Sequence, residues 1–214
     1  YPRRKDGSAC ETDFAIIGYG KLGGIELGYT SDLDLVFVHQ ADPELATDGE
    51  KPIDNAVFYT RLGQRIVHIL NTQTPSGQLY EVDMRLRPSG NSGLLVSTLQ
   101  AFEKYQREDA WTWEHQALAR ARGVAGCSET LEAFESIRHD ILCQSRDREK
   151  LRKEVVDMRE KMRASLATPE NRQAEVFHIK HDTGGIVDIE FIAQMMLLRY
   201  GASRPSLQQS NTVA

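Results

Sequence analysis

Apolar and polar residues alternate with two different periods along the chain, and the period indicates where strands and helices lie. Apolar runs over 14–17 and 32–38 are bounded by turn residues or polar sequence, which predicts two buried strands. Residues 79–86 alternate strictly and predict a third strand, and 176–180 predicts a fourth. Helices are expected where apolar residues recur every three or four positions, over 54–70, 97–105, 111–121, 128–143, 147–166 and 186–199.

The segment 54–70 illustrates the helical pattern. Asp54 is its expected N-cap, because a short polar acceptor suits the first turn of a helix. The apolar residues expected on the inner side of this helix are Val57, Phe58, Leu62, Ile66, Ile69 and Leu70.

Strands dominate the first part of the chain and helices the second. This order predicts an α/β (α+β) fold, with a catalytic domain over 1–125 followed by a mostly helical region over 126–214. The chain lacks an initiator Met and ends soon after a long apolar helix pattern. We therefore expect it to be a piece of a larger protein.

Composition narrows the class of protein. The 214 residues are 40% hydrophobic and 27% charged, as in an ordinary globular protein, and no apolar run approaches the ~20 residues that cross a bilayer. The net charge of -5 gives no general attraction to nucleic acid. Three widely spaced cysteines and the absence of a signal sequence predict a cytoplasmic protein. We expect neither a membrane nor a nucleic acid as partner.

Two carboxylates on one strand are the first candidate for chemistry. Asp32 and Asp34 stand at positions i and i+2, so they point to the same side of a strand, about 7 Å apart. Such a pair can hold hard cations, whereas without a cation the two charges repel each other beside an apolar strand. The alternative is an edge strand whose acidic residues simply face water.

A glycine-dense turn lies just upstream of the pair, at 18–24. Exposed backbone N–H groups and Lys21 can hold a polyphosphate there. The turn has neither the order of a Walker A loop nor the acidic residue of a dinucleotide-binding fold. The alternative is a tight turn with a purely structural role.

A third carboxylate is expected on the strand at 79–86. Asp83 lies on the charged face of this strand, followed on the same face by Arg85 and Arg87. Asp83 would bind a metal together with the aspartate pair, and the two arginines would bind phosphate in the same site. The alternative is a ladder of ion pairs between strands.

These residues resemble a known family. A Gly-Lys turn, ten residues and then Asp-Leu-Asp, with a third Asp on a later strand, resembles the DNA polymerase β-type nucleotidyltransferases, although Lys21 stands where they usually have Ser or Gly. Four blocks in order are similar to glutamine synthetase adenylyltransferase, particularly its C-terminal adenylylating half. The blocks are 18–35, 82–90, 111–122 and 184–191.

The resemblance implies a fold, a reaction and partners. The fold would be a mixed sheet flanked by helices and followed by a helical bundle. The reaction would move AMP from ATP to a tyrosine hydroxyl of glutamine synthetase, with Mg²⁺ or Mn²⁺ as cofactor, and the PII protein and glutamine would regulate the full-length enzyme. Asp32, Asp34 and Asp83 would be the catalytic and metal-binding residues. The residues implied in nucleotide binding are Gly20, Lys21, Gly23, Gly24, Ser31, Arg85 and Arg87.

Two alternatives remain at this point. The first is the deadenylylating half of the same enzyme, which would use the same carboxylates with inorganic phosphate as nucleophile. The second is a catalytically silent module that only binds nucleotide or the PII protein. Retention of all three aspartates argues against the silent module.

Overall fold

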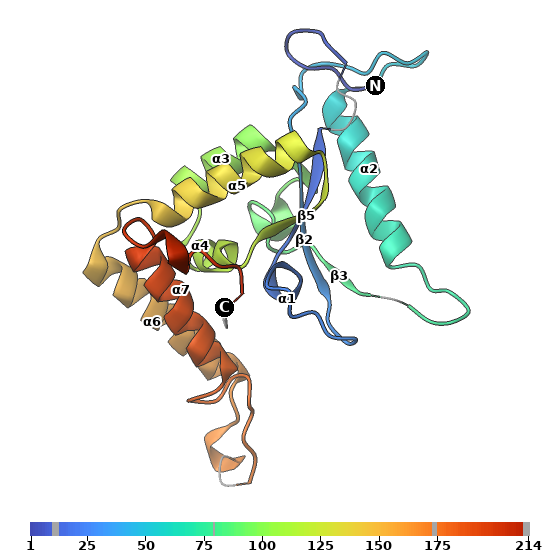
Figure 1. Cartoon of the computed structure of the whole chain (residues 1–214). Coiled ribbons are helices and arrows are strands. Elements are labelled where there is room, and N and C mark those ends of the chain that lie inside the picture. The colour runs from blue at the N-terminus through green and yellow to red at the C-terminus, as the bar shows by residue number, and fades with distance from the viewer. Residues whose placement is uncertain (10–12, 79, 173–174, 212–214) are drawn as a thin grey trace.

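A computed structural model describes residues 1–9, 13–78, 80–172 and 175–211. At its centre, within these residues, lies one sheet of five strands (Figure 1). The strands are β1 (Phe14–Gly18), β2 (Leu33–His39), β3 (Val82–Asp83), β4 (Val96–Thr98) and β5 (Arg122–Gly126).

The sheet is mixed. β1 pairs antiparallel with β2 on one edge and with β5 on the other. The other edge of β2 pairs in parallel with two short strands. β3 pairs with the beginning of β2, and β4 pairs with its end. A parallel pair needs a long crossover, and the connection from β2 to β3 carries helix α2. The predicted α/β fold with a mixed sheet is confirmed.

The helices predicted from the apolar pattern are all present; the one at 128–143 has the predicted ends, and the others differ by one to three residues at an end. Side chains cap two of them, because Thr98 accepts from the Ala101 N–H at 3.0 Å and Asp147 accepts from the Lys150 N–H at 2.7 Å. Asp54 occupies the N-cap position of α2 but forms no capping bond with its side chain. The helices are α1 (Gly20–Gly23), α2 (Asn55–Leu70), α3 (Leu99–Glu108), α4 (Thr112–Ala119), α5 (Ser128–Cys143), α6 (Arg148–Leu166) and α7 (Ile186–Tyr200). Short 3-10 turns occur at Gly90–Ser92, Glu170–Arg172 and Pro205–Leu207.

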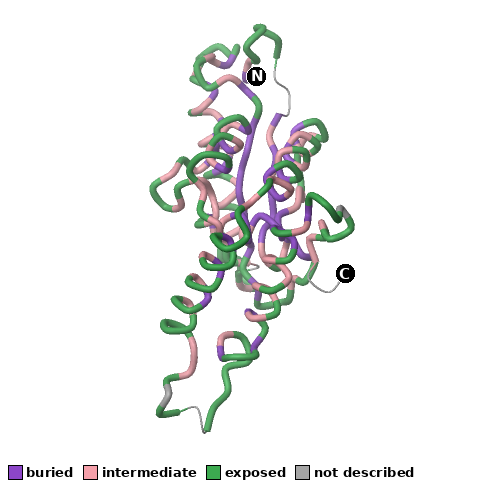
Figure 2. Tube along the Cα trace, turned by 90° about the vertical axis from the view of Figure 1, so that its left-hand side faces the viewer, coloured by how far each residue is buried: buried purple, intermediate pink, exposed green. Residues whose placement is uncertain are grey.

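Alternation along β2 directs its side chains to two different cores. Leu35 and Phe37 pack on the side of α2, whereas Val36 and Val38 pack with residues of α3 to α7. Helices therefore cover both faces of the sheet, and the buried part of the chain follows the strands (Figures 1 and 2). Asp34 lies on the Val36 side, so it faces the later helices.

Two predicted strands differ in the structure. The strand expected over 79–86 is reduced to Val82–Asp83, because β4 takes over the edge of β2 beyond that point and the chain turns after Met84. Leu79 lies outside the described residues. The strand expected over 176–180 is wrong, since the chain there turns back at His178, whose carbonyl accepts from the His181 and Asp182 N–H groups. β4 and β5 were not predicted.

One part of the predicted inner face of α2 is also wrong. Phe58, Leu62 and their neighbours pack against the sheet, but Val57 and Ile69 are 39% and 60% exposed. Val57 is five positions from Leu62, which at 3.6 residues per turn directs it away from the sheet. Ile69 belongs to the last turn of the helix.

The sheet and the later helices share one continuous core. Phe134 of α5, Leu151 of α6 and Leu197 of α7 belong to the same buried cluster as Ile17 and Val36 of the sheet. The domain boundary expected between 125 and 126 stays a prediction. Across the part of the chain that the structure describes, no helix combines the length and apolar character needed to span a bilayer.

Candidate functional site

The three predicted carboxylates lie at one end of β2. Asp34 and Asp83 occupy paired positions of the parallel strands β2 and β3, next to the pair Leu33 and Val82. Asp32 directly precedes β2 and is exposed, whereas Asp34 is half-buried and the Asp83 side chain is 15% exposed. The short strand β3 thus brings Asp83 beside Asp34. That the three carboxylates act as one site stays a prediction.

The carboxylates influence one another electrostatically. Burial raises the pKa of Asp34, and the negative charges of Asp83 and Asp32 raise it further. The positive charges of Arg85 and Lys180 act in the opposite direction on the same pKa. The end of β2 is therefore a site of concentrated negative charge that favours a cation.

Arg85 neutralises Asp83. Its Nε donates to both carboxylate oxygens of Asp83, at 3.0 and 2.7 Å, and its backbone N–H donates to Oδ1 at 2.8 Å. These bonds hold the pKa of Asp83 below its usual value. The Arg85 side chain is 73% exposed, so its other side remains open to solvent.

The carboxylates fit a metal shared with a substrate better than a metal held by protein alone. Among the described residues, no group of three or more His, Cys, Asp or Glu side chains is arranged to hold a metal ion. Mg²⁺ at phosphoryl-transfer sites is usually bound by one or two carboxylates, with phosphate oxygens and water completing the octahedron. The repulsion that raises the pKa of Asp34 is what a bound cation would relieve. Metal binding at Asp32, Asp34 and Asp83 stays a prediction.

The glycine turn lies directly against this site. Gly20 begins α1 in the left-handed region, with φ of +52°, and a Cβ at this position would stand 2.4 Å from Oδ2 of Asp34. The backbone N–H of Tyr19 donates to the Asp34 carbonyl at 2.9 Å. Glycine therefore suits both the left-handed backbone at this position and the close approach of the turn to the carboxylate.

Gly23 and Gly24 serve packing within the turn. Their N–H groups donate to the carbonyls of Tyr19 and Gly20 at 2.9 and 3.0 Å. A Cβ on Gly23 would come within 1.8 Å of the Arg120 carbonyl, so only glycine fits. Phosphate contacts at Gly23 and Gly24 stay predictions, as does the contact at Lys21, which is exposed on α1.

Ser31 and Arg87 order the loops beside the carboxylates. The buried Ser31 accepts the Gly28 N–H at its Oγ, at 3.1 Å. Arg87 donates to the carbonyls of Met84 and Gly93 at 2.7 and 3.4 Å, which closes the loop after β3. Their predicted roles in nucleotide binding stay predictions.

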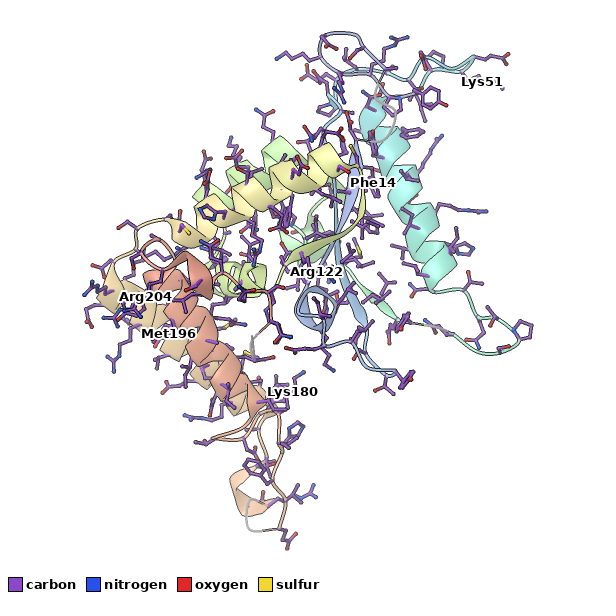
Figure 3. All side chains as sticks on the ribbon, viewed as in Figure 1. Phe14, Lys51, Arg122, Lys180, Met196 and Arg204 are labelled. Atoms are coloured by element: carbon purple, nitrogen blue, oxygen red, sulfur yellow. The ribbon has the colours of Figure 1, made fainter. Side chains whose placement is uncertain are left out.

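The sequence did not predict two arginines that bind the glycine turn and the loop after it. Arg120 is buried and forms ion pairs with Glu26, just after the turn, and with Glu190 of α7. Arg122 of β5 donates to the carbonyls of Leu22 and Gly23 at 3.1 and 3.2 Å (Figure 3). Both arginines lie in the block 111–122 that carries the resemblance, but the neighbouring sequence does not show which residues they bind.

Comparison with known proteins identifies the family. The sequence model of glutamate-ammonia ligase adenylyltransferase matches residues 1–137, a range that contains the three carboxylates and the glycine turn. The chain belongs to the glutamate-ammonia ligase adenylyltransferase family. A member of this family from Pseudomonas putida is 58% identical over 96% of the chain, and one from Hahella chejuensis is 59% identical over 96%. Both are bifunctional glutamine synthetase adenylyltransferase/adenylyl-removing enzymes.

The match to members of the adenylyltransferase family extends beyond the sheet. A third relative, from Thioalkalivibrio sulfidiphilus, is 59% identical over 94% of the chain, so similarity reaches into the helices after residue 137. The chain spans about a fifth of the length of these relatives, 22% for the Pseudomonas putida protein.

Proposed function

We propose that this chain transfers AMP from ATP to a tyrosine hydroxyl of glutamine synthetase and releases pyrophosphate. The observation that carries the proposal is the pairing of Asp34 with Asp83 across β2 and β3, against the Gly20 turn. Membership of the family supports the acceptor protein, because the relatives are named for adenylyl transfer to and removal from glutamine synthetase.

The proposed reaction is an in-line attack on the α-phosphorus of ATP. The tyrosine oxygen forms the new P–O bond, the bond to the β-phosphate breaks, and the phenolic proton passes to solvent. Mg²⁺ or Mn²⁺ held by Asp32, Asp34 and Asp83 would supply charge neutralisation on the phosphates and lower the pKa of the phenol. Arg85, with an open outer side, offers its guanidinium to the charge that develops on the phosphates.

The direction of transfer is the second part of the proposal. The blocks 18–21, 27–29 and 111–115 are similar to the adenylylating half of the family, which supports addition of AMP. Removal would use the same carboxylates, with phosphate as the nucleophile and ADP as the product. We also propose, from the resemblance, that the PII protein and glutamine regulate the full-length protein in the cytoplasm.

A pair of assays distinguishes the directions. Unmodified glutamine synthetase is incubated with the chain and ATP labelled at the α-phosphate, and adenylylated glutamine synthetase is incubated with the chain and inorganic phosphate. We expect protein-bound label in the first assay and no ADP in the second. ADP from the second assay alone would assign removal instead, and inactivity in both would contradict an enzymatic role.

A further inference from the structure

The segment that follows α7 returns to the glycine turn of the site. It contains the short turn Pro205–Leu207, and Figure 1 shows it, in red, running from the end of α7 back towards α1. The side chain of Asn211 donates from Nδ2 to the Gly24 carbonyl at 2.9 Å, across 187 positions of sequence. A part of the chain outside the range 1–137 that the family model matches is therefore in direct contact with the turn.

The carbonyls at the end of α1 accept hydrogen bonds from residues far along the chain. A helix of a single turn cannot supply partners for its own last carbonyls. Arg122 of β5 donates to the Leu22 and Gly23 carbonyls at 3.1 and 3.2 Å, and Asn211 donates to the next carbonyl, that of Gly24. Three successive carbonyls are thus bound from β5 and from the segment after α7, which fixes the orientation of the turn.

The bond from Asn211 is linked to the carboxylate site through the turn itself. The N–H of Gly24 donates to the Gly20 carbonyl at 3.0 Å. Gly20 is the residue whose Cβ would stand 2.4 Å from Oδ2 of Asp34, and the neighbouring Tyr19 N–H donates to the Asp34 carbonyl at 2.9 Å. A displacement of the turn at Gly24 therefore changes the position of Gly20 relative to the carboxylate.

Polar side chains determine where the segment after α7 is attached. The amide oxygen of Gln208 accepts from Nδ1 of His139 at 2.7 Å, and its amide nitrogen donates to the Cys143 sulfur, also on α5. A cavity of about 160 Å³ lies between the segment, α4 and α7, with Gln194 and Asn211 in its lining. Because the segment does not pack closely there, its hydrogen bonds set its position over the turn.

We propose that Asn211 is a positioning residue for ATP, acting through the glycine turn. This inference rests on the proposed function, in which the turn and the carboxylates hold the triphosphate and its metal. Without the Asn211 amide, the Gly24 carbonyl loses a donor and the turn is less firmly held beside Asp34. The turn has no proposed contact with the acceptor protein. Loss of the bond should therefore affect ATP and not glutamine synthetase.

The test separates the two substrates. The KM for ATP, the KM for glutamine synthetase and kcat are measured in the transfer assay, and the Kd for ATP in Mg²⁺ by titration calorimetry. The proteins are wild type, Asn211→Leu, Asn211→Gln and the control Gln209→Leu, an exposed amide of the same segment. We expect Asn211→Leu to raise the KM and Kd for ATP about five-fold, the usual effect of one hydrogen bond, with the KM for glutamine synthetase unchanged. Asn211→Gln keeps an amide donor and, like Gln209→Leu, should stay within about two-fold of wild type.

Three results would overturn the assignment. One is unchanged ATP affinity in Asn211→Leu. Another is an equal loss in Gln209→Leu, which would assign the effect to the segment as a whole. The third is a fall in kcat with both KM values unchanged, which a smaller folded fraction would produce and which indicates a purely structural role. Failure of wild type to transfer AMP would instead contradict the proposed function, and the calorimetric comparison would still test Asn211.

Discussion

Gly20 is the residue where backbone conformation and site geometry meet most closely. Its φ is positive, and a side chain there would enter the space of the Asp34 carboxylate. At least one glycine of the turn at 18–24 is therefore explained by the neighbouring aspartate, and not by turn formation alone.

We expect Gly20→Ala to displace Asp34 and to lower adenylyl transfer at least ten-fold. The new methyl group would lie 2.4 Å from Oδ2, and the left-handed backbone adds about 1 kcal/mol of strain. The measurement is the initial rate of label transfer. Gly28→Ala is the matched control, because a Cβ there meets only the Ser31 Oγ, at 3.6 Å, and its rate should remain within two-fold of wild type. An active Gly20→Ala protein would show that this contact is dispensable.

Ile25, in the loop after the glycine turn, has strained backbone. It is β-branched, 70% exposed and has φ of +59°. Asparagine tolerates this conformation far better, so Ile25→Asn should raise the free energy of unfolding by about 1 kcal/mol in urea titrations. Ile25→Val keeps the branching and should not stabilise. Equal stabilities of the two variants would argue against strain at this position.

At the scale of elements, Arg120 joins the glycine turn to α7. It is 7% exposed, and its two carboxylate partners come from segments 94 and 70 residues away in sequence. Long-range ion pairs of this kind leave no periodic or local signal, which is why sequence reasoning missed Arg120 while it predicted Asp32, Asp34 and Asp83.

Replacing one of these carboxylates should weaken the attachment. We expect Glu190→Gln to lower the free energy of unfolding by about 1–2 kcal/mol, because a buried guanidinium loses a charged partner that is itself partly exposed. Glu103→Gln, which removes an exposed partner of Arg107, should change it by less than about 0.5 kcal/mol. Thermal and urea unfolding report both values. Equal effects would mean that burial of Arg120 adds nothing to the pair.

The elements differ in how far the sequence could predict them. β1 and β2 are apolar runs buried in the sheet, and the long amphipathic helices carry repeated signals, so both were predicted. The strand predicted at 79–86 was too long. Alternation along a segment does not show how much of a neighbouring strand is free to pair with it, and beyond β3 the edge of β2 pairs with β4. β5 contains Gly123 and Gly126 and lacks the apolar run that predicts a strand.

At the scale of the whole molecule, buried titratable groups make stability depend on pH. His39 of β2 is 2% exposed and stacks on Tyr59 of α2, with ring centroids 4.2 Å apart. Burial lowers the pKa of His39 to about 4, against an ordinary value of 6.5. Between these values the unfolded chain binds a proton that the folded chain does not. Stability is therefore expected to fall as the pH drops from about 6.5 to about 4.

The expected size of this effect is about 2 kcal/mol between pH 7 and pH 5. His39→Phe keeps a stacked ring and removes the titrating group. The free energy of unfolding of this variant should therefore fall by about 2 kcal/mol less than that of wild type between pH 7 and pH 5. Urea titrations of both proteins at the two pH values measure the difference. Identical pH slopes would mean that His39 does not stay neutral in the folded protein.

The sheet and the glycine turn meet at one group of carboxylates, and the proposed function requires those carboxylates to carry the transfer of AMP. The most direct measurement is the transfer of α-phosphate label from ATP to glutamine synthetase by wild type, Asp34→Asn and the control Asp109→Asn, an exposed residue at the end of α3. We expect Asp34→Asn to lose at least 10³-fold in rate while keeping its fold, and Asp109→Asn to remain fully active. Undiminished transfer by folded Asp34→Asn protein would contradict the proposed function.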